Sequence, residues 1–227
     1  SHVLDGATAD EIAVVARSDA GLGVFVVAGD QVQATPVEAM YPTMPVATVA
    51  LGGVEVAGER VLVEPGDPRA CDVVAAAMHE ATVAMALTTV AACRSVLEAT
   101  VEYAKVRQQF GRPIGSFQAV KHRLADCYLA VERADALAWF AALAIAEDDP
   151  RVPLAVAMAK AATGDCTELL VRDGLQLHGG IGYTWENDLH FVLKRAITGD
   201  QLFGAAEFHR ARVAELLDLT ASTGAAA

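Results

Sequence analysis

The order of apolar and polar residues changes near residue 66, and the change predicts two kinds of structure. Before that point, short runs of β-branched and small apolar residues are separated by glycine and aspartate, which is typical of strands joined by turns. A Pro65-Gly66-Asp67-Pro68 run ends this region, because proline and glycine interrupt regular structure. The predicted strands cover residues 12–16, 23–27, 46–56 and 61–63.

Beyond residue 69 the apolar residues follow a helical period. Residues 70–107 contain no proline and predict one helix about 57 Å long, at about 1.5 Å per residue. A break at residues 111–115 separates it from a second helix, for which Ser116 is the expected N-cap. This second helix is expected to end at the Asp148-Asp149-Pro150 run. Further helices are expected over residues 152–177, after Glu186, and over residues 201–217. A frayed tail is expected from Thr220.

The second helix carries an apolar seam that indicates how the helices pack. Its apolar residues recur at alternating intervals of three and four positions, a spacing typical of an antiparallel bundle. The seam consists of Phe117, Val120, Leu124, Cys127, Val131 and Ala134. We therefore predict an α+β, mainly α, fold. Part of a β-domain in residues 1–66 would precede an up-down helical bundle in residues 67–227.

The composition favours a packed core and excludes some functions. Hydrophobic residues make up 54% of the chain and aromatic residues 6%, so small aliphatic side chains should fill the core. A formal net charge of −12 argues against a nucleic-acid-binding protein and against contact with an anionic membrane. Charges interrupt every apolar run before about 18 residues, so no membrane span is expected. No signal peptide is visible, and we expect a cytoplasmic protein.

The cysteines and histidines do not indicate a metal site. Cys71, Cys93, Cys127 and Cys166 lie within apolar helical patterns and form no CxxC motif, so we interpret them as reduced core thiols. The histidines show no spacing typical of metal ligands.

A basic segment stands out in this acidic chain. Between Tyr103 and Ala125 there is no acidic residue, whereas the segment contains Lys105, Arg107, Arg112, Lys121, His122 and Arg123. One interpretation is a solvated helix end with cations near its C-terminus. The alternative is a phosphate-binding site, because clustered cations attract a multiply charged anion.

A glycine-rich turn follows the third predicted helix, in the sequence Gln176-Leu177-His178-Gly179-Gly180-Ile181-Gly182-Tyr183. A single glycine would suffice to end a helix. Three glycines in four positions indicate that a ligand or another backbone approaches closely.

Together and in this order, the two segments carry a family resemblance. The block Arg107-Gln108-Gln109-Phe110-Gly111-Arg112-Pro113-Ile114-Gly115-Ser116-Phe117-Gln118, followed by the glycine-rich turn, resembles the C-terminal half of the acyl-CoA dehydrogenase family. Residues 5–17 and 53–62 are similar to parts of the family's central β-domain, so the resemblance covers nearly the whole chain.

The resemblance implies an FAD cofactor, bound extended between subunits. It places Arg107, Gln109 and Phe110 at the pyrophosphate and adenosine of FAD in a neighbouring protomer, with Phe117 and Gln118 at further contacts. Gln176, Gly179 and Gly180 would line the adenosine ribose and pyrophosphate from another side. These residue types suit the task, because arginine offers a planar fork to a phosphate and glycine lets the ligand approach the backbone.

The family's reaction also needs a carboxylate base in an apolar pocket, which removes the α proton of an acyl-CoA thioester. At the usual position of this base the sequence has Phe203, followed by Gly204. The family's second known position falls on Ala81, next to Glu80, which is therefore the candidate base. The alternative for Glu80 is an exposed helix residue.

Other titratable residues near Phe203 are interpreted as non-catalytic. Asp200 and Glu207 flank it, and we expect Asp200 to cap a helix and Glu207 to face an adenosine contact or solvent. His178 and His209 are expected to be structural.

Three functional hypotheses remain open. The first is a flavin-dependent acyl-CoA dehydrogenase that oxidises an acyl-CoA thioester to the 2,3-enoyl-CoA in fatty acid or lipid degradation. The second, favoured by Phe203, is a non-catalytic subunit that completes the FAD site of a partner acyl-CoA dehydrogenase in a heteromer. The third, a helical module without cofactor, leaves the basic segment and the glycine-rich turn unexplained.

The resemblance also implies the partners. They are an acyl-CoA substrate, an electron-transfer flavoprotein-type acceptor, and further chains in a homotetramer or a heterotetramer. Family members are longer than this sequence, which is therefore either a piece of a longer protein or is completed by a partner.

Overall fold

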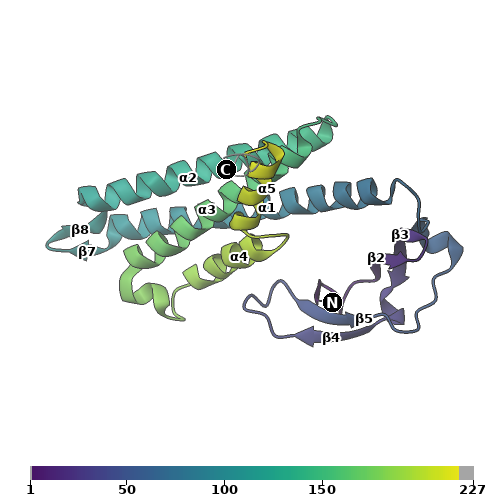
Figure 1. Ribbon diagram of the computed structural model, residues 1–227. Coiled ribbons are helices and arrows are strands. Elements are labelled where there is room, and N and C mark those ends of the chain that lie inside the picture. Colours follow the sequence, from purple (N-terminus) through teal and green to yellow (C-terminus); the bar gives the residue numbers. More distant parts are fainter. Residues whose placement is uncertain (1, 220–227) are drawn as a thin grey trace, which may run out of the picture. The chain divides into compact units, whose positions relative to one another are not determined.

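A computed structural model describes residues 2–219 of the chain (Figure 1). The chain divides into two compact units, Ser1–Met78 and His79–Ala227, and this division falls inside its longest helix. The predicted domain boundary at residue 66 marks the change from strands to helices instead, and it stays a prediction. The predicted fraying from Thr220 lies outside the described residues.

The first unit contains two three-stranded antiparallel sheets. One sheet has the strand order β1-β5-β4, from His2–Leu4, Val46–Ala50 and Gln33–Val37. The other has the order β2-β3-β6, from Glu11–Ser18, Gly21–Ala28 and Val61–Val63. Short 3-10 helices occupy Gly29–Gln31 and Gly58–Arg60. Val24 and Val63 pack with Ala70 into a small apolar core beside the second sheet.

The strand predictions are mostly confirmed. Strands β2, β3 and β6 match the predicted runs at 12–16, 23–27 and 61–63. Strand β5 ends at Ala50 rather than at residue 56, because glycines follow and Gly53 adopts a φ of 77°. Strand β4 was not predicted. It contains Pro36, which is tolerated there because β4 lies at a sheet edge.

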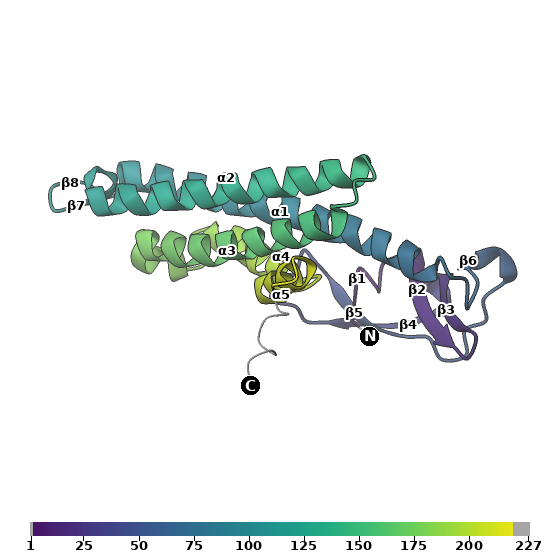
Figure 2. The ribbon, with the colours of Figure 1, turned by 45° about the horizontal axis from the view of Figure 1, so that its top comes forward.

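The second unit is a helical bundle. Helices α1 (Ala70–Val106), α2 (Gln118–Ala146) and α3 (Val152–His178) run alongside one another in both ribbon views, and α4 (Leu189–Gln201) and α5 (Ala206–Leu216) pack against α3 (Figures 1 and 2). Between α1 and α2 lie strands β7 (Gln108–Gln109) and β8 (Arg112–Pro113) and a 3-10 turn, Ile114–Ser116. A second 3-10 turn, Gly179–Tyr183, follows α3.

The bundle core confirms the predicted seam from Leu124 to Ala134, whereas Phe117 and Val120 lie outside this core. Cys127, Val131 and Ala134 are fully buried, and they pack with residues of α1 and α3 such as Val96 and Leu170. Because these side chains are small, the helices approach closely.

Three local predictions were wrong. The N-cap of α2 is Phe117, and the Ser116 hydroxyl instead donates to the carbonyl of Pro113 at 2.7 Å. The last helix begins at Ala206 rather than at residue 201, because Phe203 and Gly204 both adopt positive φ. Cys71 is exposed in the first turn of α1, whereas Cys93, Cys127 and Cys166 are buried as predicted.

Helix α1 bears on the prediction that the chain has no membrane span. Among the described residues it is the one helix long and apolar enough to cross a membrane, with a mean hydropathy of 1.5 in an 18-residue window. Core helices of soluble proteins have the same composition, and α1 contributes Val90, Cys93 and Val96 to the bundle core.

Candidate functional site

The basic segment folds into a β-hairpin at one end of the bundle. Gln109 pairs with Arg112, which leaves Phe110 and Gly111 as the two turn residues. Their φ angles of 53° and 76° are those of a type I′ turn, which normally takes asparagine or glycine at its first position. Phenylalanine there costs roughly 1–2 kcal/mol and is nevertheless 91% exposed. A strained, solvent-exposed aromatic residue indicates a contact made outside this chain.

Aromatic rings and a guanidinium group gather behind this turn. The ring of Phe117 lies edge-on to Phe110, with 6.0 Å between centroids. The guanidinium of Arg112 lies 4.1 Å from the centroid of the Phe117 ring. This cation–π contact orients a positive charge beside the exposed turn.

Several cations of this segment have no carboxylate partner. Within residues 2–219, no ion pair involves Arg107, Arg112 or Lys121. By contrast, Lys105 pairs with Glu102 at 2.5 Å, and other arginines of the bundle pair with aspartate or glutamate. In a chain with an excess of acidic residues, unpaired arginines remain available to an anionic ligand.

The glycine-rich turn has glycines of two kinds. Gly182 is buried, and a Cβ there would come within 3.0 Å of the Cβ of His178, so packing explains it. A Cβ on Gly179 or Gly180 would meet nothing within 4 Å. Gly179 adopts φ 63° and ψ −145°, which only glycine adopts readily. The open space beside Gly180 is compatible with the approach of a ligand or another chain.

Side chains of three helices join the hairpin end of α1 to the glycine-rich turn. The ring of Tyr103 stacks on His178 at 4.5 Å, and the Tyr103 hydroxyl donates to the carbonyl of His178 at 3.3 Å. The His178 Nδ1–H in turn donates to Gly174 at 2.9 Å, so this buried histidine is structural, as expected. Arg123 at the start of α2 reaches Asp173 of α3 at 3.5 Å.

The structure therefore brings the two sequence-predicted segments to one end of the bundle. Arg107, Gln109, Phe110 and Gln118 are exposed there, Phe117 is half-buried, and on the α3 side Gln176, Gly179 and Gly180 are exposed. The sequence did not predict that Tyr103 stacks on His178 of the glycine-rich turn and so links the two segments.

Glu80 lies far from this end. It is exposed on α1, roughly 40 Å before Arg107 along the helix at about 1.5 Å per residue. Its neighbour His79 is half-buried, and burial, with a smaller contribution from Arg212, lowers the pKa of that histidine. The role of Glu80 as the base stays a prediction.

The residues around Phe203 differ partly from expectation. Asp200 does not cap a helix: it lies in the last turn of α4, and the α5 N-cap is Ala205. Glu207 is exposed and pairs with Arg210 at 3.1 Å. Phe203 itself is half-buried and has a φ of 59°.

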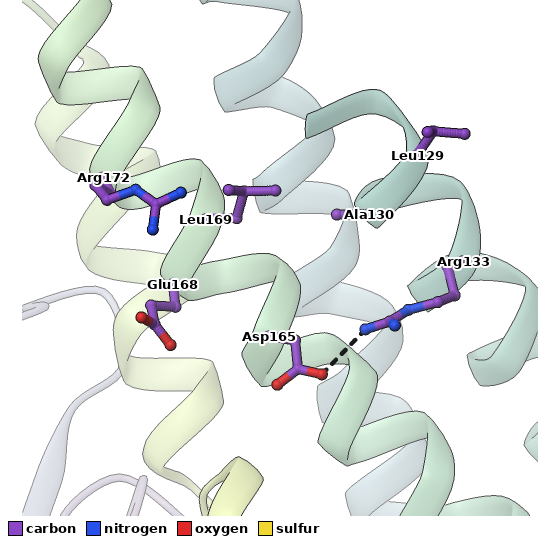
Figure 3. Close-up of a pocket in the computed structure, with 7 residues that line it drawn as sticks. All are labelled: Leu129, Ala130, Arg133, Asp165, Glu168, Leu169 and Arg172. Carbon is purple, nitrogen blue, oxygen red and sulfur yellow. Dashed lines mark hydrogen bonds and ion pairs between the residues drawn. The ribbon is translucent and has the colours of Figure 1, made fainter. Parts of the chain in front are cut away.

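A groove between α2 and α3 holds none of the predicted site residues (Figure 3). It has a volume of about 420 Å³, and Arg133 and Asp165 face each other across it at 3.0 Å. Asp165 also pairs with Arg210 at 2.5 Å, so ion pairs within the chain already engage these charges. No cluster of histidine, cysteine, aspartate or glutamate that could hold a metal ion occurs among residues 2–219.

Known proteins resemble this chain in sequence. Residues 71–217 match the family model described as acyl-CoA dehydrogenase, C-terminal domain. Acyl-CoA dehydrogenase IpdE2 of Mycobacterium tuberculosis (strain ATCC 25618 / H37Rv) is 44% identical over 122 residues, covering 54% of this chain and 36% of that protein. Acyl-CoA dehydrogenase FadE34 of the same strain is 37% identical over 173 residues, covering 74% of this chain and 22% of that protein.

A solved structure shares the fold. In the ChsE4-ChsE5 complex from Mycobacterium tuberculosis, one chain is similar with a TM-score of 0.86 and 28% identity, covering 99% of this chain and 60% of that chain. The chain thus spans well under half the length of the two curated relatives and less than two thirds of the solved chain.

Proposed function

Because the chain belongs to the acyl-CoA dehydrogenase family, we propose that it is part of an FAD-dependent acyl-CoA dehydrogenase and holds the pyrophosphate and adenosine of FAD. The observation that carries this proposal is the hairpin turn, where exposed Phe110 stands among arginines without ion-pair partners. A strained aromatic tip with free cations suits a ligand that combines an aromatic base with a diphosphate.

The residues at this end of the bundle fit such a ligand. Arg107 would bind the diphosphate, Gln109 and Gln118 would offer amide hydrogen bonds, and Phe110 and Phe117 would pack against the adenosine. From the other side, Gln176 would contact the ribose, while the open space beside Gly179 and Gly180 admits the diphosphate to the backbone. Bound FAD supplies the hydride acceptor for oxidation of an acyl-CoA thioester to the 2,3-enoyl-CoA.

The catalytic base in our proposal belongs to a partner chain. The side chain of Phe203 cannot accept a proton, and Glu80 is exposed to water. The chain would then be a non-catalytic subunit that completes the FAD site of a catalytic acyl-CoA dehydrogenase. Its likeness to a chain of the ChsE4-ChsE5 complex, which contains two different proteins, supports a heteromer.

Family membership also supports the remaining parts of the proposal. The assembly would be a soluble, cytoplasmic heterotetramer that passes electrons to an electron-transfer flavoprotein-type acceptor. A homotetramer with Glu80 as base is the competing form.

Arg107→Ala is expected to weaken FAD retention by the assembled protein about 10- to 100-fold. The substitution removes a charge-assisted phosphate contact worth roughly 1.5–3 kcal/mol, and about 1.4 kcal/mol corresponds to tenfold in affinity. FAD retention is measured by flavin absorbance after dialysis. Lys105→Ala is the matched control, because Lys105 already pairs with Glu102. Equal FAD retention in both variants would contradict the phosphate assignment.

Glu80→Gln is expected to change turnover of the assembled complex by no more than about twofold, as is usual for an exposed side chain. Turnover is followed with an artificial electron acceptor while flavin content is checked in the same sample. Loss of turnover with flavin still bound would identify Glu80 as the base and support the catalytic homotetramer.

A further inference from the structure

The side of α2 that faces away from the bundle core is apolar. Leu129, Trp139 and Leu143 are 65%, 62% and 55% exposed. Tyr128 and Phe140 are exposed beside them, whereas the core seam lies on the opposite side of the same helix. Helix α2 forms an outer edge of the bundle in both ribbon views (Figures 1 and 2). Because proteins rarely leave a contiguous patch of large apolar side chains in water, this face indicates a contact with another chain.

The residues of this face repeat every seven positions. Leu129, Ala136 and Leu143 are seven residues apart, which keeps them in line along the helix. Glu132 and Trp139 form a second row with the same spacing beside them. A seven-residue repeat is the pattern with which one helix packs along another. Helix α2 therefore has one seam for the core of its own chain and a second seam that points outward.

The charged residues at this face already have partners within the chain. Arg94 of α1 binds Glu132 at 2.7 Å and Asp135 at 3.3 Å. Arg133 binds Asp165 of α3 at 3.0 Å. A chain that covers the face would therefore leave none of these charges buried without a partner, which is the costly outcome for a charged group.

Grooves flank the face on both sides. Trp139 lines a groove of about 430 Å³ between α1 and α2, together with Arg94 and Asp135. Leu129 lines the groove between α2 and α3 (Figure 3). A ridge of large side chains between two grooves suits a second helix, because the ridges of that helix can fill the grooves.

The face is complementary to itself about Ala136. Leu129 and Leu143 lie seven residues on either side of Ala136, so they meet each other's counterparts in an antiparallel copy that crosses there. Arg133 and Trp139 lie three residues on either side, so a guanidinium of one copy meets an indole ring of the other, and like charges do not face each other. The single methyl group of Ala136 allows the two helices to approach closely. Such self-complementarity is what a two-fold contact between identical chains requires.

We propose that the outer face of α2 binds the same face of a second copy of this chain, antiparallel and across a two-fold axis at Ala136. In the heterotetramer proposed above, this contact joins the two copies of this chain, whereas FAD joins each copy to its catalytic partner. The contact itself needs no FAD, so it goes beyond the proposed function and does not rest on it.

Disulfide cross-linking at Ala136 tests the proposal in the assembled protein. The background is Cys71→Ser, which removes the exposed cysteine of α1. On oxidation with copper phenanthroline, Ala136→Cys is expected to give a disulfide-linked dimer of this chain. The reason is that the Cα atoms at the axis of two closely packed helices lie within the roughly 7 Å that a disulfide spans.

Ala125→Cys in the same background is the matched control, because Ala125 is exposed in the same row as Trp139. It lies eleven residues from Ala136, so the two copies of Ala125 in an antiparallel pair are about 33 Å apart, at about 1.5 Å per residue, and should not be linked. Three results would overturn the proposal: no linked dimer at position 136, equal linking at position 125, or a disulfide to a chain of different mass.

Leu143→Glu provides a second measurement, because it places a carboxylate of each copy against the apolar face of the other. The concentration at which half of the assemblies contain two copies of this chain should rise roughly tenfold or more, as measured by native mass spectrometry over a dilution series. Leu143 is exposed, so the variant is expected to fold, and circular dichroism checks this. A variant that keeps two copies at every dilution at which the wild type does would overturn the proposal. Wild-type assemblies that hold two cross-linkable copies but no FAD would contradict the proposed function and still support this contact.

Discussion

The free energy of unfolding of the wild type is expected to rise by about 3 kcal/mol between pH 8 and pH 10.5 because of Lys160, and replacing Lys160 by methionine is expected to abolish this rise. Burial lowers the pKa of Lys160 from 10.5 to about 8, and the nearby Asp200 carboxylate, 4.0 Å from the ammonium, offsets part of this effect. Below pH 8 the lysine is protonated in both the folded and the unfolded chain, and burying its charge costs about 3 kcal/mol.

As the pH rises from 8 to 10.5, the folded chain releases this proton before the unfolded chain does. The unfolded state then binds more protons, so the free energy of unfolding increases with pH over this window. Methionine keeps the apolar stem and cannot titrate. The titratable groups facing Lys160 from α4 and α5 are Asp200 and His209, and burial lowers the pKa of His209, away from this window.

The measurement is the denaturant-derived free energy of unfolding for wild type and Lys160→Met at pH 7.5, 9 and 10.5. The difference, wild type minus variant, should rise by about 3 kcal/mol. A difference that stays constant would show that the hydrogen bonds from the Lys160 ammonium group to the carbonyls of Gly199 and Asp200 fully offset the cost of the buried charge.

Gly199→Ala is expected to destabilise the helical unit by about 2–3 kcal/mol. Gly199 lies where α4 crosses α1, and a Cβ there would clash with the Thr89 Oγ1. Thr89 is fully buried, and its hydroxyl donates to the Met85 carbonyl at 2.8 Å, so it cannot rotate away without losing that bond. Separation of the two helices would instead open the core.

Gly180→Ala provides the matched control, because the same chemical change occurs in open space and should alter stability by no more than about 0.5 kcal/mol. Combining Gly199→Ala with Thr89→Ala should recover part of the loss, because the clashing oxygen is gone. Thermal unfolding of these three variants and of wild type measures these effects. Equal stability of Gly199→Ala and Gly180→Ala would contradict the close helix contact.

Much of the bundle could be predicted from sequence because its signals are local. The seam from Val120 to Ala134 repeats at helical spacing, and proline or glycine marks the ends of α2 and α3. The spacing of apolar residues and the positions of proline and glycine therefore suffice to predict these helices and where they end. The start of α5 was misplaced because Phe203 carries no local sign of a positive φ. His209, six residues later, donates to the Phe203 carbonyl and stabilises that conformation, and such a contact cannot be derived from composition or period.

The candidate site was predictable for a different reason. The hairpin and the glycine-rich turn have distinctive residues, so their sequence alone suggested ligand contacts, and Tyr103 and His178 join them in the fold. The roles of these residues stay predictions. The sequence could not establish the exposure of Glu80, because a lone glutamate in an apolar run is compatible with both a buried base and a solvated helix face.

Native mass spectrometry of the assembled protein, purified without added flavin, tests the central claim most directly, because it reports chain composition and bound cofactor together. Our account predicts two different chains that share bound FAD, with the catalytic carboxylate on the partner. A single kind of chain carrying FAD would contradict the heteromer and make Glu80 the leading base. An assembly without FAD would contradict the account as a whole.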